Sequence, residues 1–228
     1  SWGLGLAAVS KQKAYRGFDR ETNLLPLVEF ENQYVRVFGP GLRVKLPGLH
    51  ISETQRLNFS LVGKYDFSGY EADDSPFLAG MRERKGGFWA GARAEWQTSV
   101  AKLSTEWTAD TSGHSKGQML SLGIEKTWRF GQHVMLTPRV VAVWQDRKYV
   151  DYYYGVRADE VRPGRAVYRG ESAVNAEVGL RGVYTFDRNH SVFLDVGATR
   201  LASEIRNSPL ASRSSENTLL LGYVYRFR

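Results

Sequence analysis

The sequence lacks cysteine, has only 7 prolines in 228 residues, and contains no long apolar run. A membrane-spanning helix needs about 18 consecutive apolar residues, so helical membrane proteins are excluded. The absence of cysteine excludes disulfides and hints at an oxidising compartment, where stray thiols are a liability. Few prolines, together with 23 glycines and 13% aromatic residues, favour many strands joined by tight turns.

The charge of the chain is positive but dispersed. The net charge of +7 would be compatible with nucleic acid or anionic lipid. The basic residues are scattered singly, however, and no element combines a basic cluster with interleaved aromatics. Nucleic-acid binding is therefore not predicted. The chain opens on Ser1-Trp2-Gly3-Leu4, already in a strand pattern, which we interpret as a processed mature form.

Apolar residues alternate with polar residues along most of the chain. Between Phe88 and Trp96 every second residue is apolar or aromatic, and Arg93 and Glu95 fall between them. A helix would instead repeat apolar residues at i, i+3, i+4 and i+7. The alternating runs have about 10 to 14 residues, enough to cross a membrane as a tilted strand. Strands of soluble sandwiches more often have about 5 to 6 residues. Aromatic residues gather at the ends of the runs, as girdles at two membrane interfaces require.

The connections between runs fall into two alternating length classes. Short ones lie near residues 32–34, 98–99, 130–133 and 187–190, and longer polar ones cover 11–23, 68–86, 111–117, 145–172 and 204–216. Outer-membrane barrels have short periplasmic turns and long extracellular loops. The sequence therefore predicts an all-β fold: one antiparallel transmembrane β-barrel over residues 1–228, located in the bacterial outer membrane.

The strand number depends on residues 34–46. Ten strands are clear elsewhere, and two periplasmic termini require an even total. Read as a short hairpin about Gly39-Pro40-Gly41, this stretch gives twelve strands, with 50–55 as another periplasmic turn. Twelve is our prediction, and ten is the fallback.

The C-terminal end carries alternating aromatics at Tyr223, Tyr225 and Phe227. This pattern resembles the signal that the barrel-assembly machinery recognises in outer-membrane proteins. The usual signal ends on the phenylalanine, whereas Arg228 follows here, either as a tag remnant or as the natural end.

The positions that alternate with the apolar face are rich in charges of both signs. Two interpretations follow: a structural network of cross-strand ion pairs, or the lining of a narrow pore with a basic excess that favours anions. The candidate lumen residues are Arg43, Lys45, Lys64, Arg93, Glu95, Lys102, Glu106, Glu125, Arg129, Arg139, Glu177, Arg181, Asp195 and Arg226.

The longest predicted loop, residues 145–172, is rich in tyrosine and arginine. These residue types are over-represented in binding hot spots, and arginine suits lipopolysaccharide phosphates. A loop that folds inward as a plug is the other interpretation. The candidate binding residues are Tyr152, Tyr153, Tyr154, Arg157, Arg162 and Arg165.

No catalytic, metal or cofactor site is predicted. Residues 113–117 match the Gly-x-Ser-x-Gly pattern, but strands flank the motif on both sides, so it is interpreted as a polar hairpin loop. His114 is adjacent to Ser115 and is poorly placed to act as its base. No strand face carries metal-ligand spacing of His, Asp or Glu.

Several short segments together resemble the MipA/OmpV family of outer-membrane proteins. They lie at 15–19, 25–31, 41–46, 77–81 with Arg84, 110–118, 152–156, 208–210 and 225–227. The resemblance implies a non-enzymatic outer-membrane barrel that acts as a scaffold between murein hydrolases and synthases. A murein lytic transglycosylase and a synthase are then the expected protein partners, beside outer-membrane lipid, lipopolysaccharide and the assembly machinery. The alternative function is a narrow channel or a portal for small molecules such as antibiotics.

Overall fold

The computed structural model describes residues 1–227, so Arg228 lies outside the described part of the chain. The strands are β1 (Trp2–Gln12), β2 (Glu21–Glu31), β3 (Val35–Phe38), β4 (Gly41–His50), β5 (Arg56–Asp66), β6 (Gly87–Gln97), β7 (Lys102–Asp110), β8 (Gln118–Glu125), β9 (Trp128–Phe130), β10 (Val134–Gln145), β11 (Ala173–Thr185), β12 (His190–Arg200) and β13 (Ser215–Phe227). The helical elements are η1 (Ala72–Asp74), η2 (Pro76–Leu78), α1 (Arg147–Tyr154), η3 (Ala158–Glu160) and α2 (Ser203–Arg206). None of the described helices has the length and apolar composition to cross a membrane.

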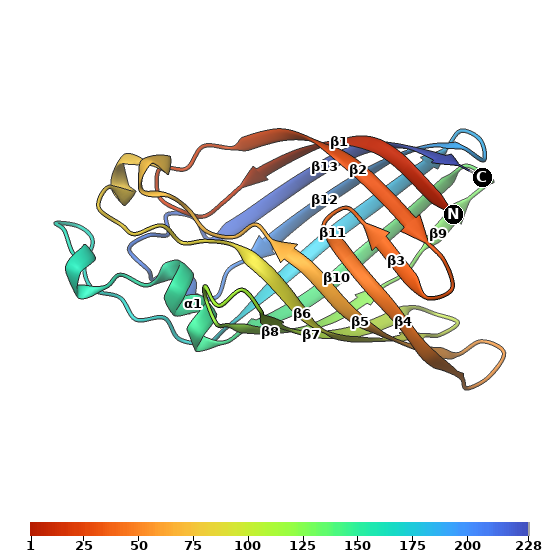
Figure 1. Cartoon of the computed structure of the whole chain (residues 1–228), viewed down its shortest axis with the longest axis horizontal. Helices are drawn as coiled ribbons and strands as arrows, with labels where there is room; N and C mark the ends of the chain where they lie inside the picture. Colours follow the sequence, from red (N-terminus) through yellow and green to blue (C-terminus); the bar gives the residue numbers. More distant parts are fainter. Residues whose placement is uncertain (228) are drawn as a thin grey trace.

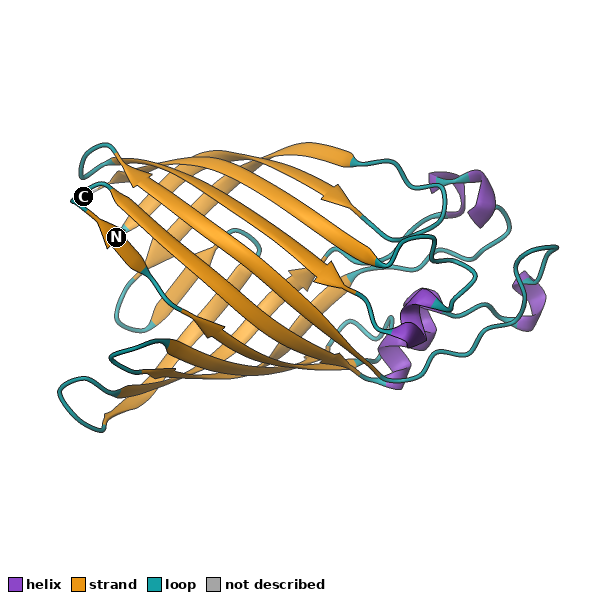
Figure 2. Cartoon of the chain, turned by 180° about the vertical axis from the view of Figure 1, so that it is seen from behind, coloured by secondary structure: helices purple, strands orange, loops and turns teal. Residues whose placement is uncertain are grey.

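The strands form one closed antiparallel barrel (Figures 1 and 2). Apart from β8 and β9, each strand pairs with its neighbour in the chain, and β1 closes the cycle by pairing with β13. β8 and β9 both pair with β10, so they are two parts of one strand. The interruption lies opposite Pro138 of β10, which has no N–H to donate to the ladder. The twelve predicted strands are confirmed, as is the short hairpin about Gly39-Pro40-Gly41.

The two ends of the barrel differ as the sequence predicts. Short turns and both termini lie at one end, and the long connections with all helical elements lie at the other (Figure 1). In an outer-membrane barrel the short turns are periplasmic and the long loops are extracellular. The long loops therefore mark the outer end.

Strand register separates an apolar outer face from a polar interior. The outer face carries large apolar side chains that remain exposed on the isolated chain, such as Leu24 at 70%, Leu122 at 59% and Val174 at 59%. In a soluble protein such exposure would be unfavourable, but here these side chains contact lipid. The alternating residues between them line the lumen.

The wall has one irregular place, beside the short strand β3. β2 pairs with β1 from Glu21 to Phe30, but it pairs with β3 at three positions only, Glu29 to Glu31. The β3–β4 hairpin ends at Gly39 and Pro40, well below the outer end of β2. Within the described part of the chain, the outer part of β2 therefore has a strand on one side and none on the other.

The terminal aromatics seal the seam between the first and last strands. Tyr223, Tyr225 and Phe227 lie on the outer face of β13, in register with Leu6, Leu4 and Trp2 of β1. The rings of Trp2 and Phe227 stack with their centroids 4.1 Å apart and an interplanar angle of 13°. The residues of the predicted assembly signal thus also close the barrel.

We expect Phe227→Ala to lower the free energy of unfolding by about 1 kcal/mol, because the stacked pair at the seam is lost. Urea unfolding in lipid vesicles, followed by tryptophan fluorescence and by heat-modifiable gel mobility, measures the change. Trp2→Phe keeps an aromatic ring opposite Phe227 and serves as the matched control. A Phe227→Ala protein as stable as the parent would contradict a role of the stack in closure.

Candidate functional site

A network of ion pairs crosses the inner face of strands β4 to β8. Arg93 on β6 is its centre, with Nε 3.0 Å from Glu95 Oε1 and Nη1 3.4 Å from Glu106 Oε1. Lys102 joins Glu95 at 3.1 Å to Glu125 at 3.5 Å. Two further cations complete the network: Arg43 at 3.1 Å from Glu95, and Lys64 at 3.0 Å from Glu106. Five neighbouring strands are thereby held in one register.

A second network lies across β10, β11 and β12. The guanidinium of Arg139 contacts Glu177 at 3.0 Å and both carboxylate oxygens of Asp195 at 2.9 and 3.0 Å. Arg181 reaches the same Asp195 at 3.1 Å. The bidentate geometry is the stronger form of an arginine–carboxylate pair. Both carboxylates of this network therefore pair with arginine: Glu177 with Arg139, and Asp195 with Arg139 and Arg181.

The predicted lumen residues near the periplasmic end form separate contacts and no extended network among the described residues. Lys45 pairs with Glu31 at 2.7 Å, and Arg226 pairs with Glu29 at 3.3 Å. Arg129 joins neither network and donates to Sδ of Met135 at 2.8 Å. Sequence reasoning missed Glu29, Glu31 and the inward-facing Arg36. The alternation of Glu29 and Glu31 with the apolar Val28 and Phe30 was a usable signal for the two acids.

One cavity in the middle of the lumen is strongly basic. It has a volume of about 380 Å³, and we call it the basic chamber. Its charged lining residues are Arg36, Arg43, Lys64, Arg93, Glu106 and Arg181. Five cations and one carboxylate line this space, and all of the cations except Arg36 also pair with Glu95, Glu106 or Asp195. The basic excess that remains favours an anion over a cation.

The outer loops pack against one another into an apolar cluster that we call the outer cap. Its buried members come from the long loops except the one between β7 and β8: Ala14, Tyr15, Phe18, Tyr70, Leu78, Met81, Tyr149, Val150, Tyr153, Tyr154, Val156, Leu201, Ile205 and Leu210, with Trp89 and Ala173 from the strands below. Hydrogen bonds tie the loops further: the Tyr15 hydroxyl donates to the Tyr153 carbonyl at 2.8 Å, and Tyr153 donates to the Lys85 carbonyl at 2.7 Å. Burial raises the pKa of Tyr70 to about 12, so this phenol stays neutral.

A buried ion pair fastens the loop after α1 to the loop after β5. Arg84 Nη2 lies 2.8 Å from Glu160 Oε1, with side-chain exposures of 4% and 1%. Burial alone would raise the pKa of Glu160, but hydrogen bonds from Arg84 and from the backbone N–H groups of Arg82 and Arg157 lower it to about 2. Glu160 is therefore charged throughout the physiological range. The pair is held from both sides and acts as a clamp on the outer cap.

Arg165 is a second clamp, and it forms no ion pair with an acidic side chain within residues 1–227. Its guanidinium donates four hydrogen bonds to backbone carbonyls: to Glu160 at 2.9 and 2.7 Å, to Phe77 at 2.6 Å and to Ala79 at 2.9 Å. A buried cation is tolerated when its donors are satisfied in this way. The residue joins η3 to η2 across the outer end.

The structure divides the predicted loop-binding residues into two groups. Tyr153, Tyr154 and Arg165 are 1%, 7% and 2% exposed, so they hold the cap together and present no surface to a partner. Tyr152 and Arg157 are half-buried, and Arg162 is exposed. The tyrosine core of this loop is packed into the outer cap.

The Gly-x-Ser-x-Gly segment forms a tight loop between β7 and β8. The Asp110 carboxylate accepts hydrogen bonds from the hydroxyls and backbone N–H groups of Ser112 and Ser115 and from the N–H of Lys116. Ser115 is buried, and its hydroxyl also accepts from the Gly117 N–H at 3.1 Å. His114 Nδ1 lies 2.6 Å from the Gly86 carbonyl and 3.3 Å from Ser112 Oγ. These contacts shape a turn, in which His114 contacts Ser112 and Gly86 and not Ser115.

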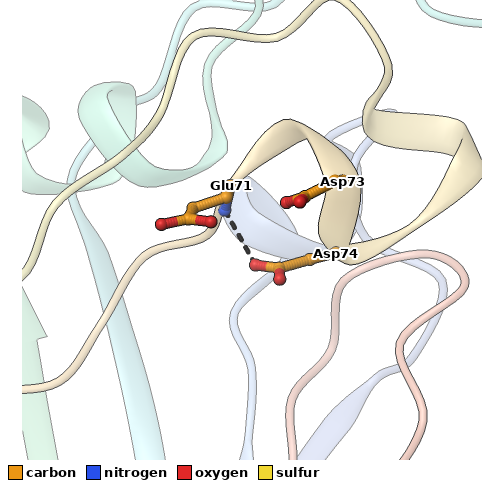
Figure 3. Close-up of side chains that lie close together, drawn as sticks. All are labelled: Glu71, Asp73 and Asp74. Carbon is orange, nitrogen blue, oxygen red and sulfur yellow. Dashed lines mark hydrogen bonds between the residues drawn. The ribbon is translucent and has the colours of Figure 1, made fainter.

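Three carboxylates gather on η1 at the outer surface: Glu71, Asp73 and Asp74 (Figure 3). The backbone N–H of Glu71 donates to Asp74 Oδ2 at 2.7 Å, which closes the short helical turn. Repulsion from Glu83, Asp73 and Asp74 raises the pKa of Glu71. All three side chains are exposed, and the cluster is accounted for by the turn it caps.

We expect Glu160→Gln to loosen the outer cap by about 3–5 kcal/mol, because it leaves the Arg84 guanidinium buried without its counter-ion. Since the folded-state pKa of Glu160 is depressed to about 2, this stabilisation is present above the ordinary glutamate pKa and is lost as the pH falls toward 2. Hydrogen exchange of residues 146–172 between pH 2 and 7 measures both effects. Asp159→Asn breaks an exposed pair with Arg82, of 65% and 60% exposure, and should change little. Equal effects of the two variants would refute the clamp.

Comparisons with known proteins agree with this architecture. Residues 4–227 match the family model of the MltA-interacting protein MipA. The chain is 25% identical to the putative outer membrane protein YiaT of Escherichia coli (strain K12), over 98% of this chain and 90% of that protein. It is also 25% identical to the MltA-interacting protein of the same organism, over 100% of this chain and 90% of that protein.

A solved structure shows the same fold. The NanC porin aligns over 98% of this chain and 100% of its own, with a TM-score of 0.51 and 10% sequence identity. The predicted location is confirmed, because the relatives are outer membrane proteins and the barrel is of the outer-membrane type. The family model spans nearly the whole chain, and the chain therefore belongs to the family of the MltA-interacting protein MipA.

Proposed function

We propose that the protein is a non-enzymatic interaction protein of the outer membrane that engages murein machinery from its periplasmic end. The observation that carries this proposal is the full-length match to a relative named for its interaction with MltA, a lytic transglycosylase. A murein lytic transglycosylase, together with a synthase, is the proposed partner class. The outer end carries the packed loops of the outer cap, and murein lies on the periplasmic side of the membrane, so we place such a partner at the periplasmic rim.

The periplasmic rim offers an apolar surface on the β4–β5 hairpin. The hairpin extends beyond the neighbouring turns at this end (Figure 1). Leu49 and Ile51 on the hairpin are 58% and 54% exposed, and Val100 on a nearby turn is 66% exposed. The pairing of β4 with β5 shifts register between Leu46 and Leu49, which marks a β-bulge. Bulges redirect a strand end, so this tip is a natural contact for a partner.

The other proposed partners follow from the faces of the barrel. Outer-membrane lipid surrounds the apolar band, and lipopolysaccharide phosphates suit the exposed Arg162 on the outer cap. The barrel-assembly machinery is the proposed reader of Tyr223, Tyr225 and Phe227 on β13.

We expect the double variant Leu49→Glu and Ile51→Glu to weaken binding of a purified MltA-type lytic transglycosylase by roughly tenfold or more, because exposed apolar anchors are lost. Pull-down and biolayer interferometry with the full-length protein in nanodiscs measure it. Val161→Glu with Val167→Glu changes two exposed valines on the outer cap and is the matched control.

Folding of each variant is checked by heat-modifiable gel mobility. Binding that is unchanged in the hairpin variant would remove the hairpin from the proposal. Failure of the parent protein to bind the transglycosylase would overturn the murein function itself.

A second candidate, a narrow portal for small anions, is favoured by the basic chamber. A portal predicts uniform conductance steps in a planar bilayer with a preference for anions. Arg36→Glu with Arg43→Glu should then reverse or abolish this preference, because both side chains line the chamber. Protein that is shown to be folded and yet gives no conductance steps would eliminate this candidate.

A further inference from the structure

The outer half of β2 leaves an opening in the barrel wall between β2 and β5. From Glu21 to Leu27, β2 has β1 as its only strand neighbour within residues 1–227. The Val28 carbonyl accepts from the Gly39 N–H at 3.1 Å, whereas the Glu31 N–H donates to Ser1 on the β1 side. Because backbone groups alternate along a strand, Thr22, Leu24 and Pro26 present theirs to the opening.

Proline occupies the place where a free N–H would be most costly. Unpaired backbone groups are unfavourable in the hydrocarbon layer, and proline in sheets is favoured at edges and at interruptions of the ladder, such as the one opposite Pro138. Pro26 has no N–H, so it removes one unpaired donor from this edge. The lipid-facing side chains at this level, Leu24 at 70% and Leu6 at 54% exposure, are apolar, whereas Thr22 and Ser10 above them are polar. The opening therefore lies at the depth of the outer-leaflet acyl chains.

Behind the opening lies an apolar cavity, which we call the lateral pocket. Its volume is about 500 Å³, and its apolar lining residues are Ala7, Val9, Leu25, Leu27, Phe38, Pro40, Phe67 and Leu220. These side chains belong to inward-facing positions of β1, β2, β3 and β13 or to the adjoining loops. Inward positions elsewhere in the barrel carry the two ion-pair networks. Leu25 is 42% exposed although it faces inward, so an apolar occupant would stabilise it.

Two lysines stand at the outer end of the lateral pocket. Lys13 donates to the carbonyls of Gly69 at 3.1 Å and Phe67 at 3.4 Å, and Lys11 lies 5.4 Å from the centre of the Phe67 ring. Neither ammonium group forms an ion pair with a carboxylate among the described residues, although Glu21 also lines this end. Outer-leaflet head groups lie at this height, above the apolar cavity.

We propose that the lateral pocket binds a single acyl chain with an anionic head group, which enters sideways from the outer leaflet. The chain lies against Leu25, Leu27 and Leu220, and the head group lies at Lys11 and Lys13. The outer cap lies over the outer end of the barrel, and the opening beside β2 offers a lateral route. This site is independent of the proposed periplasmic partner.

Photo-crosslinking in outer-membrane vesicles tests the proposal. The probe is palmitate with a mid-chain diazirine, and adducts are mapped to residues by mass spectrometry. Adducts on inward-facing Leu25, Leu27 or Leu220 are the expected result. Adducts confined to lipid-facing Leu6, Leu24 and Val28 would overturn it, because any barrel in a bilayer gives those.

Matched variants on one strand separate the pocket from the lipid face. Leu25→Trp fills the pocket and should abolish the inward adducts, whereas Leu24→Trp points to lipid and should leave them unchanged. Lys11→Gln with Lys13→Gln should lower the inward adducts roughly tenfold, because a charge-assisted contact to the head group is lost. Equal adduct yields in all three variants would overturn the site.

A phosphatidylglycerol with the same photoreactive chain distinguishes the source of the acyl chain. Inward adducts from both probes identify a membrane lipid that enters by its chain, and inward adducts from palmitate alone identify a free amphiphile. Absence of inward adducts from both probes, in protein shown to be folded, would overturn the proposal. The unpaired edge of β2 would then be available to pair with a strand of another protein.

Discussion

Satisfaction of backbone hydrogen bonds in a medium without water is the constraint on which this structure depends. In hydrocarbon every N–H and C=O needs a partner, and a closed antiparallel cycle of strands supplies one. The pairing of β1 with β13 closes the cycle, and the stacked Trp2 and Phe227 mark the seam. The outer part of β2 departs from this rule, because one of its edges has no strand partner within residues 1–227. An occupant would therefore be most favourable at this segment of the wall.

The interior is divided into regions of different chemistry. Two ion-pair networks occupy the lumen faces of β4–β8 and β10–β12, whereas the lumen faces of β1, β2 and β13 are apolar around Ala7, Leu27 and Val224. Above them the outer cap is held by the Arg84–Glu160 clamp and by Arg165. Charged pairs that neutralise each other fix strand register, and the apolar sector beside them faces the opening. This division favours entry from the membrane over passage along the axis.

Strand positions could be predicted from the sequence because a half-lipid, half-polar strand must alternate with a period of two. The same periodicity placed Arg93, Glu95 and Arg139 on the inner face. It could not pair them, because partners such as Arg139 and Asp195 are 56 residues apart and meet only through register. Tyr153, Tyr154 and Arg165 have the composition of a binding loop and also that of a packed one, and only long-range contacts decide between these. The opening beside β2 arises from the mismatch between an eleven-residue strand and a four-residue neighbour, and its position depends on barrel closure.

Cross-strand nuclear Overhauser contacts of β2, measured on the protein in lipid nanodiscs, test the opening most directly. We expect contacts from Glu29 and Phe30 to both β1 and β3, and from Glu21–Leu27 to β1 alone. A regular ladder of contacts from Thr22, Leu24 and Pro26 to a second strand would show that the wall is closed, and would contradict lateral access.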